Sequence, residues 1–274
     1  MNENARMTST RPLFIAHLSD LHLDGGAASW SRAAAVMESI RSSRTPLDAI
    51  VITGDIADGS STAVDAQLES LLDGLPSAVP IVCCSGNTDD ASSIRRIRQG
   101  FETAIRIEGL VIVPIDCAPG SPARLLPRSL ARARAQLETL GPDDRALLAV
   151  HHPPAPLHDT VGDQLLLQAV DDLAELTEHP AVIGVIAGHT HSATVSTFRT
   201  VPLLIAPGVR SEGRLPHVEV TEHGDALVDD RSNPGYLLHR IDGRTITSYV
   251  RQAPLAPTTP TLSGQHPEDV RSVG

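Results

Sequence analysis

Residues 13–22 read LFIAHLSDLH, an apolar run that ends in two side chains able to bind a metal ion. Leu13–Leu18 is apolar almost throughout, as in a buried strand, and Asp20 and His22 follow it directly. Further strands of this kind are predicted at Ala49–Thr53, Pro80–Cys84, Leu110–Ile115, Ala146–Val150 and Val182–Ala187, with helical patterns at about Trp30–Arg41, Ala63–Leu72, Leu130–Leu140 and Gln164–Glu178. This alternation predicts an α/β protein with a mostly parallel sheet covered by helices on both faces.

After Ala187 the pattern changes to shorter strands, which predict hairpins or a second, mixed sheet. These strands are expected at Ala193–Phe198, Leu203–Ala206, His217–Thr221, Tyr236–Ile241 and Thr245–Val250. Residues 1–11 are polar and predict a flexible N-terminal segment, and residues 253–274 predict a Pro-rich, disordered tail. The predicted folded domain therefore spans residues 12–252.

The composition argues against several classes of partner. The 274 residues include 22 basic and 33 acidic side chains, for a formal net charge of -11. A nucleic-acid polymer would require a basic face, whereas a small anionic substrate needs only local positive charge. No apolar run approaches the roughly 20 residues that span a bilayer, so no membrane partner is expected. The three Cys fit neither a disulfide framework nor a metal-binding pair, which favours a reduced, cytoplasmic compartment.

Candidate metal ligands directly follow five of the predicted strands. The motifs are Ser19-Asp20-Leu21-His22, Gly54-Asp55, Ser85-Gly86-Asn87-Thr88-Asp89, His151-His152-Pro153-Pro154 and Gly188-His189-Thr190-His191. Because ligands of α/β sheets bind at the carboxyl ends of the strands, we expect these loops to meet. Each motif alone has an ordinary structural explanation, such as a turn or a helix cap for an Asp. Their recurrence at equivalent positions favours a metal site.

The side chains in these loops suit two divalent cations. Imidazole and carboxylate ligands favour Mn, Fe or Zn over a softer metal. A carboxylate such as Asp55 can bridge two ions, and Asn87 can supply a neutral oxygen. Two ions about 3.5–4 Å apart can clamp the attacking and leaving oxygens of an in-line displacement at phosphorus.

The ordered set D-x-H, G-D, G-N-x-D, H-x-P and G-H-x-H, from Asp20 to His191, resembles that of the calcineurin-like metallophosphoesterases. The residue sequences of the last two motifs are most similar to those of the bacterial class III cyclic-nucleotide phosphodiesterases. The resemblance implies a four-layer α/β sandwich, with two mixed β-sheets flanked by helices. It also implies one metal held by Asp20, His22, Asp55 and His191, and a second held by Asp55, Asn87, His151 and His189. Dimerisation is common in that family, so a homodimer is a candidate state.

Thr88 departs from the family pattern, which usually has a His that assists the leaving group or the transition state. A hydroxyl can donate a hydrogen bond to phosphate, but it cannot act as a general acid near neutral pH. Such assistance is typically worth about 10²–10⁴-fold. His152 is the nearest imidazole in sequence that could substitute, unless it only holds its own loop. The candidate catalytic residues are therefore Asn87, Thr88 and His152.

These observations predict a dinuclear phosphodiesterase in which a metal-bridging hydroxide attacks a small phosphodiester in line. A cyclic nucleotide or a glycerophosphodiester is the expected substrate. Three alternatives stay open: a phosphomonoesterase, a nuclease, and a metal-binding interaction module with weakened catalysis. The net charge of -11 disfavours the nuclease, and only Thr88 supports the interaction module. Nearby, Asp89 is expected to fix its loop and Asp58 to serve as a turn or cap residue.

Overall fold

The computed structural model describes residues 11–75, 77–89, 103–120, 123–157, 163, 166–213 and 228–255. Three predictions lie wholly or mostly outside these residues: the flexible segment 1–11, the strand His217–Thr221 and the tail 253–274. Within the described residues, no helix is long and apolar enough to cross a membrane.

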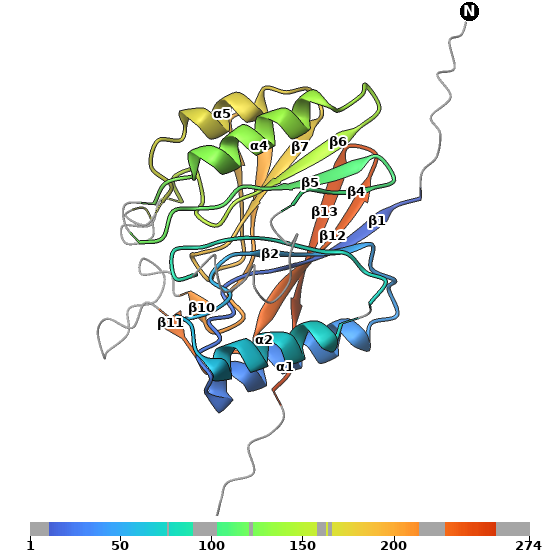
Figure 1. The fold of residues 1–274 in the computed structure, drawn as a ribbon. Helices are drawn as coiled ribbons and strands as arrows, with labels where there is room; N and C mark the ends of the chain where they lie inside the picture. The colour runs from blue at the N-terminus through green and yellow to red at the C-terminus, as the bar shows by residue number, and fades with distance from the viewer. Residues whose placement is uncertain are drawn as a thin grey trace, which may run out of the picture.

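Two β-sheets pack face to face in the centre of the molecule (Figure 1). The five-stranded sheet has the order β13-β12-β1-β2-β3, with β1 at Leu13–Leu18, β2 at Ala49–Thr53, β3 at Ile81–Cys84, β12 at Gly235–Asp242 and β13 at Thr245–Gln252. The six-stranded sheet has the order β4-β5-β6-β7-β9-β8, with β4 at Ile105–Ile107, β5 at Leu110–Pro114, β6 at Arg145–Ala149, β7 at Val182–Ala187, β8 at Thr194–Phe198 and β9 at Val201–Ile205. A separate pair joins β10 at Glu212–Gly213 to β11 at Val228–Asp229.

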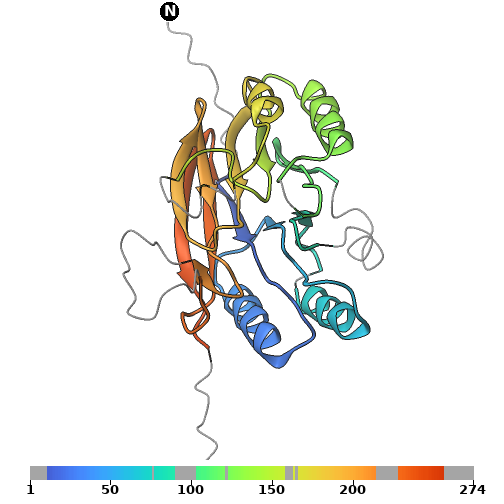
Figure 2. The same ribbon diagram turned by 90° about the vertical axis from the view of Figure 1, so that its left-hand side faces the viewer.

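Helices cover the outer face of each sheet and complete four layers, as the family resemblance implies. The helices are α1 (Ala27–Arg41) and α2 (Thr62–Asp73) on the five-stranded sheet, and α4 (Pro127–Glu138) and α5 (Asp171–Thr177) on the six-stranded sheet. Figure 2 shows the two helix pairs on opposite sides of the molecule, with both sheets between them.

The strands β1, β2, β5, β6 and β7 are apolar on both sides because each one separates two cores. In β1, Leu13 and Ile15 pack between the sheets, whereas Ala16 and Leu18 pack under the helices. This alternation follows from the two-residue period of a strand. Both faces must therefore be apolar, although only one of them meets helices.

The prediction of one mostly parallel sheet with helices on both faces is wrong. The six long strands are present, but β1, β2 and β3 lie in one sheet and β5, β6 and β7 in the other. An apolar face packs equally well against helices or against a second sheet, so the pattern could not distinguish these arrangements. The helix predicted from Gln164 begins only at Asp171, because Ala169 has a φ of 56°, which no right-handed helix accommodates.

The two sheets place the candidate ligand loops at one edge of the molecule. Strands β1, β2 and β3 are mutually parallel, as are β5, β6 and β7. Five of the six loops that leave their carboxyl ends carry the predicted ligand motifs, and these loops meet across the boundary between the sheets.

Candidate metal centre

One group of candidate ligands joins the loops after β1, β2 and β7. His191 Nε2 lies 3.4 Å from Asp20 Oδ1 and 3.3 Å from His22 Nε2. His22 Nε2 in turn lies 3.6 Å from Asp55 Oδ2. The four side chains predicted to hold the first metal therefore point their ligand atoms at one small volume.

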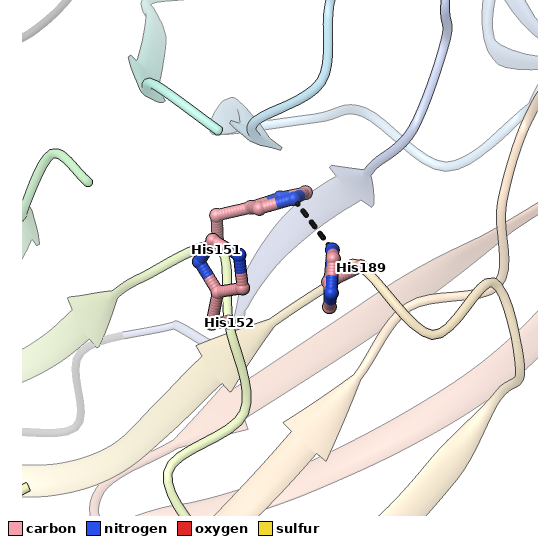
Figure 3. Close-up of side chains that lie close together, drawn as sticks. All are labelled: His151, His152 and His189. Atoms are coloured by element: carbon pink, nitrogen blue, oxygen red, sulfur yellow. Dashed lines mark hydrogen bonds between the residues drawn. The ribbon is translucent and has the colours of Figure 1, made fainter. Parts of the chain in front are cut away.

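A second group shares Asp55 with the first. His151 Nε2 lies 3.4 Å from Asp55 Oδ2 and 3.1 Å from His189 Nδ1. Figure 3 shows His151 and His189 facing each other from the ends of β6 and β7, with His152 beside them. Asn87 belongs to the loop after β3, whose next residue, Thr88, donates its N–H to Asp55 Oδ1 at 3.0 Å. Asp55 is the carboxylate that both groups have in common.

Two buried oxygens at these groups fit a bound cation. Asp20 Oδ1 and Asn87 Oδ1 have no hydrogen-bond partner among the described residues, although both atoms are buried. Buried polar atoms are nearly always paired in folded proteins, and each exception calls for an explanation. A carboxylate oxygen and an amide oxygen can each bind a divalent cation. The donor set of Asp, His and Asn therefore fits two divalent metal ions of the Mn, Fe or Zn type.

The backbone adopts the left-handed region at five of the seven candidate ligands. These are Asp20 (φ 56°), His22 (44°), Asp55 (47°), His189 (71°) and His191 (57°). This conformation is unfavourable for residues other than Gly, and such strain clusters at functional sites. The conformation repeats at both ends of D-x-H and of H-x-H. In D-x-H it accompanies two side chains, Asp20 and His22, that reach the same group, whereas His189 and His191 of H-x-H reach different groups.

Glycines in the motifs allow these loops to approach one another. A Cβ atom at Gly86 would overlap Asp55 Oδ1, and one at Gly188 would overlap the Ser19 hydroxyl and lie 2.9 Å from Asp20 Oδ2. A side chain at either position would therefore displace a candidate ligand.

Three ligand histidines are oriented through their second ring nitrogen. Their Nδ1 contacts are His22 to Asp58 Oδ1 at 2.7 Å, His151 to the Thr53 carbonyl at 2.7 Å, and His191 to Ser211 Oγ at 2.8 Å. When Nδ1–H donates in this way, the Nε2 lone pair is left facing the centre, which is the usual arrangement for metal-binding histidines.

Asp58 and Ser211 are functional candidates that sequence reasoning missed. Asp58 was expected to be a turn or cap residue, but it is the acceptor for the ring of His22. Ser211 lies after β9, outside every predicted motif. Neither residue carried a signal that could be read without knowing the fold.

Asp89 has the loop-fixing role expected from its motif. Its carboxylate accepts backbone N–H groups from Ile56 at 2.8 Å, Ala57 at 3.0 Å and Gly86 at 2.8 Å. Burial raises the pKa of Asp89 to about 6, although these backbone hydrogen bonds favour the ionised form. Asp89 thus ties the Asp55 loop to the Asn87 loop.

Asp55 and His151 shift each other's pKa in opposite directions. Burial alone would lower the pKa of His151, but the hydrogen bond and the charge of Asp55 outweigh it and raise this pKa to about 9. The same pairing holds the pKa of Asp55 far below its usual range, against the effect of burial. In the metal-free protein His151 therefore carries a proton that a metal ion must displace.

The two catalytic candidates Thr88 and His152 have partners of their own. The Thr88 hydroxyl donates to the Ala57 carbonyl at 3.2 Å. His152 Nδ1 lies 3.2 Å from Cys117 Sγ, and its ring centroid is 4.2 Å from that of His189. Burial, with a smaller effect of the nearby His151, lowers the pKa of His152 to about 3. His152 can offer a neutral N–H group, but it holds no acidic proton at neutral pH.

Comparison with known proteins yields one family and several relatives. The calcineurin-like phosphoesterase family model matches residues 14–193. A probable cyclic nucleotide phosphodiesterase of Rhodococcus erythropolis is 28% identical over an alignment of 211 residues that covers 70% of this chain and 69% of that protein. A cAMP/cGMP dual specificity phosphodiesterase of Mycobacterium tuberculosis is 30% identical over an alignment of 217 residues that covers 72% of this chain and 67% of that protein. The crystal structure of a dimetal phosphatase from Danio rerio superposes on this chain with a TM-score of 0.59 at 15% identity and covers 89% of this chain and 100% of the other. This likeness supports the fold.

Proposed function

Since the chain belongs to the calcineurin-like phosphoesterase family, whose members are metal-dependent hydrolases of phosphoric esters, we propose that it is a dinuclear phosphodiesterase acting on a small phosphodiester. The observation that carries the proposal is the meeting of two ligand groups at Asp55, whose Oδ2 lies 3.6 Å from His22 Nε2 and 3.4 Å from His151 Nε2. A shared carboxylate can bridge two adjacent cations of such a two-metal site.

The first metal would be held by Asp20, His22, Asp55 and His191, and the second by Asp55, Asn87, His151 and His189. When bound, two such cations supply Lewis acidity and activate water as a nucleophile near neutral pH. The protein supplies fixed ligand positions, because His22, His151 and His191 are each anchored through Nδ1. It also supplies a polar amide at Asn87, whose oxygen is available for a cation and whose NH2 group can donate to phosphate.

A cyclic nucleotide is the proposed substrate, with a glycerophosphodiester as the alternative diester. Support for the cyclic nucleotide comes from the two relatives described above, which are both named for this activity. The net charge of -11 favours a small phosphoester over a nucleic-acid polymer.

Thr88 supports a second candidate, a metal-binding module with weakened catalysis. Its hydroxyl is engaged with the Ala57 carbonyl, and His152 is neutral at neutral pH. Neither residue can protonate a leaving group there. This would slow substrates with poor leaving groups, such as ribose hydroxyls, more than activated esters.

Hydrolysis of bis(p-nitrophenyl) phosphate beside p-nitrophenyl phosphate, with added Mn²⁺ and then with chelator, tests the proposal. We expect diester cleavage that stops on chelation, and cyclic nucleotides and glycerophosphodiesters would then be compared as substrates. The variant His189→Ala should lose this activity. His179→Ala should keep it, because His179 lies before β7, away from the centre, where its Nδ1 accepts the Ala181 N–H at 3.2 Å.

Each other outcome leads to a different function. Preference for the monoester would make the protein a phosphatase that uses the same metal centre. Absence of turnover on both esters, with metal bound, would support the binding module.

A further inference from the structure

The segment Pro207–Ser211 is hydrogen-bonded to the loops that carry the first metal group. Its contacts are Gly208 N–H to the His191 carbonyl at 3.0 Å, Val209 N–H to the Ser19 carbonyl at 3.0 Å, Arg210 N–H to the Asp20 carbonyl at 2.9 Å, and His191 Nδ1 to Ser211 Oγ at 2.8 Å. Two of the four first-metal ligands, Asp20 and His191, are therefore held by this one segment.

Arg32 on α1 holds the segment in turn. Its Nε donates to the Val209 carbonyl at 2.9 Å, and its Nη1 donates to the carbonyls of Asp230 and Ser232, each at 2.8 Å. The side chain is only 3% exposed. Arg32 thus joins α1, Pro207–Ser211 and the chain after β11, which lie together at one side of the molecule (Figure 1).

The second metal group has other supports, apart from the His189 N–H, which donates to Asp20 Oδ2 at 2.9 Å. Its ligand His151 is held by the Thr53 carbonyl, and the loops of Asp55 and Asn87 are held by Asp89. None of the hydrogen bonds described for Arg32 reaches these supports. A change at Arg32 should therefore lower the affinity for the first metal more than that for the second.

We propose that Arg32 is a positioning residue for the first metal ion, acting through Pro207–Ser211 on Asp20 and His191. The proposal rests on the dinuclear centre proposed above. A guanidinium suits this role because its planar fork donates in several fixed directions, whereas a Lys ammonium is a single point. Changing an outer residue that orients metal ligands typically lowers metal affinity by about 10–100-fold.

Arg145 is a matched control at the other end of the sheets. It is also buried, and it donates to the Gly243 carbonyl at 3.0 Å and to the Glu108 carbonyl at 2.9 Å. It begins β6, whose opposite end leads to His151. Arg145→Met likewise removes a buried guanidinium that donates to backbone carbonyls, but at a place remote from the centre.

The test is calorimetric titration of the metal-free protein with Mn²⁺. Arg32→Met and Arg145→Met are each made in two backgrounds: Asn87→Ala, which leaves the first site, and His191→Ala, which leaves the second. We expect Arg32→Met to weaken Mn²⁺ binding by at least about tenfold in the Asn87→Ala background. In the His191→Ala background its effect should stay within about twofold, as should that of Arg145→Met in both.

Equal losses from Arg32→Met in the two backgrounds, or no loss in the Asn87→Ala background, would overturn the proposal. If circular dichroism shows that Arg32→Met is unfolded, Arg32→Lys takes its place and should give a smaller loss with the same selectivity. Binding of fewer than two Mn²⁺ ions by the wild-type protein would instead refute the dinuclear centre itself. The wild-type titration therefore separates failure of the proposed function from failure of the role of Arg32.

Discussion

Replacing Asp55 by Asn removes one acceptor from the carboxylate at the middle of the centre. Asp55 Oδ1 accepts the N–H of Thr88 at 3.0 Å, while Oδ2 lies 3.4 Å from His151 Nε2 and 3.6 Å from His22 Nε2. An Asn side chain has only one acceptor oxygen. Either the Thr88 N–H loses its partner, or an NH2 group faces the centre, where it cannot bind a cation.

Both arrangements of the introduced amide are costly. An unpaired buried N–H costs about 1–3 kcal/mol, which corresponds to about 5–150-fold in affinity. Changes to residues that only orient a ligand already lower metal affinity by about 10–100-fold. Because one oxygen of Asp55 faces both groups, we expect Asp55→Asn to lower the affinity for both metal ions by more than about 100-fold. Diester turnover should fall with them.

Metal content after dialysis and Mn²⁺ titration measure the effect, beside hydrolysis of the chromogenic diester. Asp48→Asn is the matched control, because Asp48 Oδ2 accepts the Phe14 N–H at 2.8 Å at the opposite end of β2. This variant should keep both metal ions and full turnover. Retention of two tightly bound ions and wild-type turnover by Asp55→Asn would refute Asp55 as the bridge.

Further changes test the surroundings of the centre. Asp58→Ala removes the acceptor of the His22 ring and should lower the affinity for the first metal ion by about 10–100-fold. Asp58→Asn should lower this affinity less. Equal losses of affinity in Mn²⁺ titrations would contradict the orienting role of Asp58. Thr88→His should speed a diester with an alkoxide leaving group by about 10²–10⁴-fold and leave the nitrophenyl ester nearly unchanged; equal gains on both would argue against a missing acid. Burial lowers the pKa of His17 and that of His239, the latter to about 4. Below pH 6.5 the unfolded chain therefore binds protons that the folded one does not, and stability should fall towards pH 4 by roughly 1.4 kcal/mol per pH unit for His239, with a further fall from His17. Urea unfolding of the metal-free protein should show a shallower fall for His239→Gln, and an unchanged slope would contradict this origin.

Much of the fold could be predicted from the sequence because its central strands are apolar and bounded by clear turns. The bounds predicted for β1, β2 and β7 agree with the structure. The division into two sheets could not be read from local pattern, since helices and a second sheet provide the same apolar surroundings. The strand β4 is only three residues long, with none of them buried, and leaves no such pattern.

The candidate ligands could be predicted from the sequence because each lies in a loop directly after a strand. The residues that support them were not, because their contacts join distant positions. Asp58 is 36 residues from His22, and Arg32 is 177 residues from Val209. Such contacts depend on how the two sheets stack, which local propensity does not encode.

Stepwise addition of Mn²⁺ to the metal-free protein, with electron paramagnetic resonance and diester hydrolysis measured on the same samples, tests the dinuclear centre most directly. The ligand groups that meet at Asp55 predict that turnover appears with the second equivalent of Mn²⁺, together with the spectrum of a coupled ion pair. Full turnover with one ion per chain, or turnover that survives chelation, would contradict a centre built on a shared carboxylate.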